Sequence, residues 1–495
     1  MAEGTLLPNL SWLNSSESRA LANSFSTSFR VGVNLIGVER TDRDDDIFRG
    51  VAFANANARA DATALATTED DFIAFAFAGA DADASASSFA VGLTNRNKIK
   101  TARGKDVFAG ISFANSLAAA NANAESAAVS DFGLAVAIAN NRATAYANAF
   151  SVGIHNGNRA VIKTKSGGDT IRGQAFANAN ASAVTQTTAY IAGVIASSQA
   201  EVRNINVTTS LTVLGINNNG AIKTGNGVDL IQGVAIGKGT AWAEAATTMA
   251  IAIADAVGSA NVSATVSAQL STIAIGLNND GSGKRKGQIM AGSGRDRVVG
   301  IGISDSSSAV ATASATAQAR GRSSTSNTVT FTTVQAAPNE SIGINNIDGL
   351  IDMGRGRDTV EAYGRTYGLV GGTVELGRGD DVLQAGIIDR YNSRGTVESF
   401  AADQTGALEN VDVFGGEGDD NFILHSIFGK NVTLNGGEGF DQLELAGNID
   451  QYTIRVGSIA NQTLIISRDR FSMTVQEIEQ IHIGNQVFNF TDFQV

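Results

Sequence analysis

A motif that returns about every 61 residues constrains this chain more than any other feature. It consists of an aliphatic residue, glycine, a second aliphatic residue and an asparagine within the next two positions. The spacings between its glycines are 60, 61, 62, 61 and 67 residues, and the glycines are Gly32, Gly92, Gly153, Gly215, Gly276 and Gly343. A second motif, Gly-x-Asp-x-apolar-x-Gly, follows at a fixed offset, as in residues 104–110. Such repetition indicates stacked units, each contacting its neighbours.

Between these motifs the sequence alternates with a period of two. Every even position is alanine from Ala52 to Ala66 and again from Ala74 to Ala86. This alternation predicts β-strands with one alanine face, because a helical array, the alternative that alanine suggests, needs a period of 3.6. The chain has only two prolines, Pro8 and Pro338, which suits long strand ladders.

Each unit therefore supplies two long strands, a polar break and a turn that runs from the asparagine to Gly-x-Asp. We expect an all-β fold, a two-layered β-solenoid of ~61-residue repeats in which alanine lets the layers approach closely. An antiparallel meander fits the same periodicity. In both arrangements the Asp turns stack along one edge, since each unit contributes one such turn.

The Gly-Asp turns become richer toward the C-terminus. Residues 415–422 and 436–443 match Gly-Gly-x-Gly-x-Asp-x-apolar in full, and residues 354–360 and 377–383 match it closely. The pattern resembles the nonapeptide of RTX proteins, the haemolysin-type calcium-binding family. The resemblance extends more loosely over residues 34–447. It departs from the family in one respect, because most copies here stand one per repeat instead of running consecutively.

Calcium takes six to eight oxygen ligands at roughly 2.4 Å, and a tight glycine turn can present several backbone carbonyls to it. The acidic balance, with a net charge of −12, also suits a hard cation. The resemblance implies that calcium lies between successive turns. The ligand residues it implies are Asp229, Asp296, Gly354, Gly356, Asp358, Gly377, Gly379, Asp381, Gly416, Gly418, Asp420, Gly437, Gly439 and Asp441. Asp106 and Asp169 match less completely. The alternative is that these are ordinary turns in which Asp bonds its own backbone.

These patterns divide the chain into four segments. Residues 1–33 read as an N-terminal half-repeat or cap, 34–345 as five β repeats, 346–447 as an RTX-like calcium-binding β-roll, and 448–495 as a β cap. The last segment resembles the one that follows RTX repeats in bacterial proteins exported by type I secretion. Residues 1–13 show no basic segment followed by an apolar one, and cysteine is absent. We therefore expect a secreted protein, extracellular or on the cell surface.

No catalytic pattern stands out, and we expect no enzyme. The three histidines, His155, His425 and His482, are far apart, and no Gly-x-Ser-x-Gly elbow occurs. The acidic charge disfavours nucleic acid as a partner, and no apolar run is long enough to insert into a membrane.

Long strands in a flat solenoid leave two wide edges of unpaired backbone. Residues 18–33 resemble the second strand of a unit without its first, so a neighbouring molecule could complete it. We expect a head-to-tail homopolymer that builds a fibre, sheath or surface layer. The alternatives are a monomeric calcium-dependent adhesin, an ice-binding protein, a protein that binds a cell-surface glycan, and a secretion scaffold for another protein.

Overall fold

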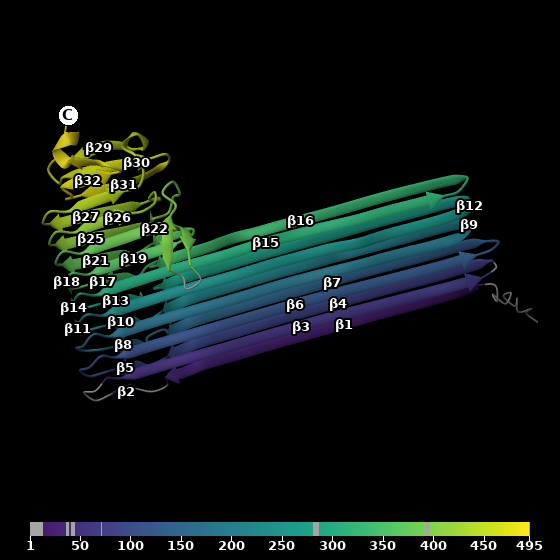
Figure 1. The fold of residues 1–495 in the computed structure, drawn as a ribbon, viewed down its shortest axis with the longest axis horizontal. Coiled ribbons are helices and arrows are strands. Elements are labelled where there is room, and N and C mark those ends of the chain that lie inside the picture. The colour runs from purple at the N-terminus through teal and green to yellow at the C-terminus, as the bar shows by residue number, and fades with distance from the viewer. Residues whose placement is uncertain are drawn as a thin grey trace, which may run out of the picture.

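The computed structural model describes residues 13–35, 39–40, 45–70, 72–280, 287–392 and 396–494. The described chain is almost entirely β. It forms a long, flat arm that projects from one side of a stack of short coils, here called the roll (Figure 1). The roll rises past the arm toward the C-terminus.

Each coil of the arm has an outgoing long strand, a tight turn at the tip, a returning long strand and a short strand in the roll. The outgoing strands are β3 (Ile47–Asp70), β6 (Val107–Ser130), β15 (Arg297–Arg320) and the first halves of β9 (Thr170–Asn218) and β12 (Leu230–Asn278). The returning strands are β1 (Leu13–Leu35), β4 (Ile73–Asn95), β7 (Leu134–Asn156), β16 (Ser323–Asn345) and the second halves of β9 and β12.

Short strands line a second sheet of the roll. They are β2 (Glu39–Arg40), β5 (Lys98–Lys100), β8 (Val161–Lys163), β10 (Ala221–Lys223), β11 (Asn226–Gly227), β13 (Gln288–Met290), β14 (Ser293–Gly294), β17 (Leu350–Asp352) and β18 (Arg355–Gly356). Corresponding strands of successive coils pair in parallel, as between β3 and β6 and between β4 and β7. Parallel pairing of consecutive coils confirms the solenoid and rules out the meander, whose neighbouring strands would be antiparallel.

After Asn345 the long strands stop and the roll continues alone. Its further strands are β19 (Thr359–Gly364), β20 (Tyr367–Val370), β21 (Thr373–Arg378), β22 (Val382–Tyr391), β23 (Val397–Phe400), β24 (Leu408–Glu409), β25 (Val411–Glu417), β26 (Asn421–Leu424), β27 (Val432–Glu438) and β28 (Gln442–Leu445). The end is covered by η1 (Ile449–Gln451), β29 (Thr453–Ser458), β30 (Thr463–Arg468), β31 (Phe471–Gln476), β32 (Gln480–Ile483), β33 (Gln486–Asn489) and η2 (Phe490–Phe493). Strands β30 and β33 turn back antiparallel to β31 and β32, which ends the parallel stack.

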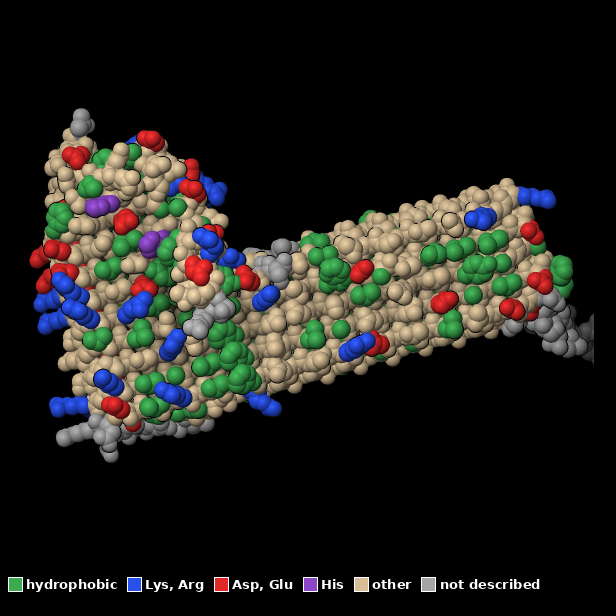
Figure 2. All heavy atoms as spheres, viewed as in Figure 1, with side chains coloured by type: hydrophobic (Ala, Val, Ile, Leu, Met, Phe, Trp, Pro, Cys, Tyr) green, Lys and Arg blue, Asp and Glu red, His purple; other side chains and the backbone are tan. Residues whose placement is uncertain are grey.

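The arm has a core made almost wholly of alanine. Even-numbered residues of β3, from Ala52 to Ala66, are buried, whereas their odd-numbered neighbours are exposed. A methyl side chain occupies little depth, so the two layers pack closely and the expectation from the alternation is confirmed. Figure 2 shows that the visible face of the arm carries few charged side chains, while the margin of the roll carries many.

The roll has a conventional core of larger side chains, such as Leu93, Ile99 and Phe108, which come from the different sides of each coil. Beside this core lies a ladder of buried asparagines, in which each side-chain amide donates to the next. The distances are 2.8, 2.7, 2.7 and 2.7 Å along Asn95, Asn156, Asn218, Asn279 and Asn346. The ladder explains why asparagine recurs in the repeat: its amide carries one bond from coil to coil.

The coils are not of equal length, and the surplus residues form β-bulges. One register shift lies between Asn141 and Arg142, where β9 has one residue more than β7. Others separate Ala245 from Thr247 and Ala264 from Val266 in β12. A bulge absorbs a single extra residue without turning the alanine face outward along the rest of the strand.

Candidate metal site

One edge of the roll carries an unbroken ladder of aspartates. The backbone N–H of each donates to the carboxylate Oδ1 of the next, at 2.7–3.1 Å. The members are Asp46, Asp106, Asp169, Asp229, Asp296, Asp358, Asp381, Asp420 and Asp441. The ladder ends where the N–H of Asp441 donates to Oε2 of Glu479 at 2.8 Å. Each coil therefore fixes the carboxylate of the following coil through its own backbone.

The second carboxylate oxygen, Oδ2, is buried in all nine aspartates and makes no well-formed hydrogen bond, although the hydroxyls of Thr101 and Thr224 lie close enough to Asp106 and Asp229 to offset part of the rise in pKa that burial causes in these two. From Asp106 to Asp441 the side chains are at most 2% exposed. A buried carboxylate oxygen without a donor is costly, and folded proteins nearly always satisfy such atoms. Nine such oxygens lie in a row along one edge, and a cation is the partner that would satisfy them.

Burial raises the pKa of seven of these carboxyl groups, and neighbouring carboxylates add to the effect. The pKa rises to about 6 for Asp229, Asp358 and Asp441, to about 7 for Asp296 and Asp420, and to about 8 for Asp381. Burial also raises the pKa of Asp106. At neutral pH the carboxyl groups with the highest pKa, such as Asp381, are thus partly protonated, and a cation beside them would favour the ionised form.

The glycine turns beside the ladder are shaped by close backbone contact. A Cβ on Gly356, whose φ is +146°, would lie 1.4 Å from the carbonyl oxygen of Gly294. A Cβ on Gly415 would lie 2.2 Å from Oδ2 of Asp420. Any larger residue would therefore fill the space that faces the free oxygen. The same left-handed conformation recurs at Gly354, Gly356, Gly377, Gly379, Gly416, Gly418, Gly437 and Gly439.

The structure brings all the residues proposed from the sequence to this one edge. The six aspartates belong to the ladder, and the eight glycines form the turns beside it. Asp106 and Asp169 make the same backbone contacts as the others. Two members were not among the predicted residues. Asp46 belongs to a unit whose turn has Asp44 in place of glycine, and Glu479 comes from the cap, where no repeat indicates it.

The donor set suits a hard cation. Within the described ranges no three His, Asp or Glu side chains come close enough together to hold a metal by themselves. A cation in the ladder would therefore take one or two carboxylate oxygens and complete its shell with backbone carbonyls of the glycine turns. Calcium accepts such an all-oxygen shell, whereas zinc prefers imidazole and thiolate ligands.

Comparison with family models, with curated proteins and with solved structures finds no match for this chain. Among the described residues there is also no helix of the length and apolarity that a membrane span requires. The aspartate ladder is therefore the feature on which a functional argument can rest.

Proposed function

We propose that this chain is a secreted, calcium-binding structural protein of the RTX type, without catalytic activity, that assembles outside the cell into a fibre, sheath or surface layer. The observation that carries the proposal is the file of unpartnered, buried Asp Oδ2 atoms beside left-handed glycines. Calcium supplies the positive charge that these oxygens lack, and it does so without needing a third side chain.

In this proposal the residues of two consecutive turns would hold each ion. The Asp carboxylate would be the charged ligand, and the glycine carbonyls would be neutral ones. Because the Oδ1 of each ladder aspartate from Asp106 to Asp441 already accepts an N–H from the preceding coil, these side chains are held in place before the ion binds. Binding then joins coil to coil and stabilises the whole stack, since the ion binds the folded chain and not the unfolded one.

Extracellular placement fits this dependence, because calcium modules outside cells work at dissociation constants of about 10⁻⁴–10⁻³ M. The antiparallel strands after Ile449 have the place in the chain expected for the segment that follows RTX repeats in type I export. The long open edges of the arm supply the surface for assembly.

Calcium titration of EGTA-treated protein tests the proposal. Circular dichroism and sedimentation velocity are recorded together on the same samples. We expect thermal stability and sedimentation coefficient to rise with calcium but not with an equal concentration of magnesium, which demands a smaller and more regular shell. If the folded protein keeps the same stability and the same mass with and without calcium, the Gly-Asp turns are ordinary turns that bind no calcium.

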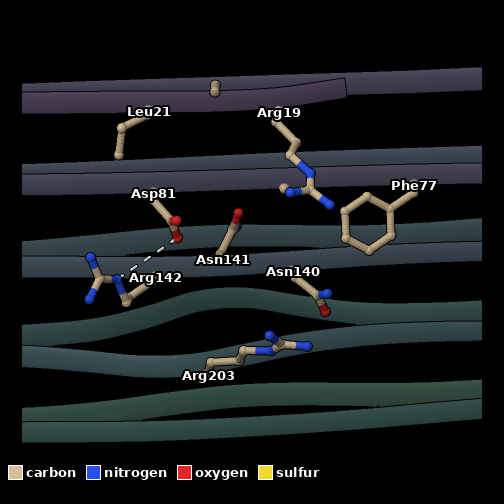
Figure 3. A pocket seen from close by; sticks show the side chains of 10 residues that line it. Arg19, Leu21, Phe77, Asp81, Asn140, Asn141, Arg142 and Arg203 are labelled. Carbon is tan, nitrogen blue, oxygen red and sulfur yellow. Dashed lines mark ion pairs between the residues drawn. The ribbon is translucent and has the colours of Figure 1, made fainter. Parts of the chain in front are cut away.

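A second candidate, a monomeric adhesin that binds a glycan, is supported by a hollow of about 480 Å³ on the arm. Figure 3 shows Arg19, Phe77, Asn140 and Arg203 around it. The Arg19 guanidinium lies 5.5 Å from the centre of the Phe77 ring, so an aromatic face and polar donors line one surface. Glycans bind by such combinations of stacking and hydrogen bonding.

A glycan array separates the two candidates. Specific binding that is lost in Phe77→Ala, by a protein that stays monomeric in calcium, would favour the adhesin. Assembly in calcium without glycan binding would favour the structural protein. Phe72→Ala, at the arm tip and outside the hollow, is the matched control.

A further inference from the structure

The N-terminal edge of the arm ends in two strands that each lack a partner on one side. Within the described residues, β1 pairs only with β4 and β3 pairs only with β6. Strand β3 packs against both β1 and β4, so it lies between them in height. The returning layer therefore overhangs the outgoing layer by half a strand spacing at this edge.

The outward faces of these two strands carry large exposed apolar side chains. On β1 the exposed fraction is 76% for Phe25 and 59% for Phe29, and on β3 it is 51% for Val51 and 60% for Phe53. A long unpaired edge with apolar side chains is a template for pairing with another chain unless something covers it.

Two hydrogen bonds fix where β1 lies relative to β3 along the arm. The N–H of Asn57 donates to Oγ of Ser26, and the N–H of Arg59 donates to Oγ of Ser24, both at 3.1 Å. The residue numbers in each bonded pair add to 83. This relation gives the residue of β3 that lies level with any residue of β1.

The opposite edge of the arm is also open along most of its length, because β15 pairs with β19 only over residues 297–301 and β16 pairs with β20 only over residues 342–345. The parallel stack of the roll is closed at its C-terminal end by β29–β31 and β33, and the roll rises beside the last arm strands, β15 and β16 (Figure 1). A second molecule placed head to tail on β16 would have to occupy the space that the roll already fills. Among the described residues, none blocks the N-terminal edge along the arm.

We propose that the N-terminal edge of the arm binds the same edge of a second copy, across a two-fold axis that runs along the arm. This inference rests on the proposed structural role and replaces head-to-tail stacking as its first contact. The rotation exchanges the two layers, so β1 of one copy pairs antiparallel with β3 of the other, and the reverse. The overhanging β1 of each copy lies beside the recessed β3 of the other copy, so both layers continue without a gap.

The register follows from the two serine contacts. Residues that face each other in an antiparallel pair point to the same side, so odd-numbered outer residues of β1 meet odd-numbered outer residues of β3. Their numbers must add to an even value, and 82 is one of the two values nearest to 83. This value places Phe29 beside Phe53 of the second copy and Val31 beside Val51, so the exposed apolar rows pack against each other along the new edge.

On the outer faces the same register opposes no like charges, because Arg59 of the second copy faces Asn23 and Arg19 faces Thr63 of the second copy. The two serine caps are released in the pairing, because backbone carbonyls of the second copy take over the N–H groups of Asn57 and Arg59. Serine hydroxyls near the axis can rotate without moving the backbone.

Disulfide trapping tests the proposal, because the chain has no native cysteine. In the double variant Thr27→Cys/Asn55→Cys the two thiols lie on opposite outer faces of one arm, so they cannot join within a molecule. They face each other only across the two-fold axis. The comparison variant is Asn23→Cys/Thr333→Cys, whose positions belong to one column of the returning layer on its first and last strands. It reports head-to-tail stacking.

After mild oxidation in calcium, we expect the first variant to form one species of twice the 50.9 kDa chain mass and the second to stay uncrosslinked. The added change Phe53→Lys should abolish the first cross-link by placing a charge in the apolar row. A polymer ladder from the second variant, or assembly without a cross-link in the first, would overturn the two-fold contact. Calcium binding measured on the same samples keeps the two questions apart. If the protein binds calcium but forms no dimer, only the two-fold contact is refuted. If the dimer forms without any effect of calcium, only the role of calcium is refuted.

Discussion

Replacing Asp381 with asparagine should stabilise the metal-free protein and destabilise the calcium-loaded one. The side chain is 1% exposed, and burial raises its pKa to about 8. Asparagine has nearly the same shape and can still accept the N–H of Asp358, a bond of 2.7 Å, through its Oδ1. It removes the charge that is costly without a cation and that binds the cation when one is present.

The magnitude follows from the pKa. An exposed aspartate titrates near 3.8, and each pH unit between the exposed and the buried pKa costs about 1.4 kcal/mol of folding free energy. At pH 7 the upper limit is therefore about 4 kcal/mol. Adjacent carboxylates share this cost, because protonation of one relieves the next, so we expect a gain of roughly 1–3 kcal/mol in EGTA. In saturating calcium the sign should reverse.

Urea unfolding, in EGTA and in calcium, measures both effects. The control is Asp380→Asn, one residue away, whose carboxylate is exposed and pairs with Arg357 at the surface. It should change stability little in either condition. If Asp381→Asn lowers the stability of the metal-free protein, or leaves its calcium affinity equal to that of the control, the reasoning about the ladder is wrong.

Three further predictions concern pH, turns and core. Because folding raises the pKa of six ladder aspartates to values between about 6 and 8, the folded metal-free chain binds more protons than the unfolded chain across this range. Its melting temperature in EGTA should fall from pH 5 to pH 8, and calcium should remove this slope. Gly356→Ala should lower the free energy of unfolding by several kcal/mol, at least about 2, because its Cβ would collide with the carbonyl oxygen of Gly294. Gly79→Ala, which meets only the Phe77 ring at 3.6 Å, should be neutral by the same urea assay. Ala120→Leu should cost about 1–3 kcal/mol by overfilling the alanine core, whereas Ala119→Leu on the outer face should cost little, as thermal melts would show.

The fold could be predicted in large part because the side-chain pattern repeats with the period of the coils. Alternating alanine specifies both the strand and its buried face, and the recurring glycine and asparagine mark where each coil turns. The choice between solenoid and meander could not be made, since a strand with one small apolar face suits a parallel or an antiparallel neighbour equally. The structure shows parallel pairing, because β3 pairs with β6 of the next coil and not with β4 of its own coil.

The candidate site was predictable wherever glycine and aspartate occur together. The chain of N–H bonds from one Asp to the next could not be predicted, because it depends on the stacking distance and not on any residue type. For the same reason Asp106 and Asp169 read as poorer matches, although their contacts equal those of Asp358. Glu479 belongs to a segment without repeats, so only the folded cap brings it to Asp441.

Through the bulges, the length of a repeat affects the local shape of the protein surface. An arm whose core consists mostly of alanine leaves little room inside for an extra residue, so a single-residue insertion appears as a local distortion of the layer that carries it. The residues at the bulge after Asn141, together with Arg203 in the neighbouring strand, line the hollow of Figure 3. Variation in repeat length thus gives an otherwise uniform plate its individual surface features.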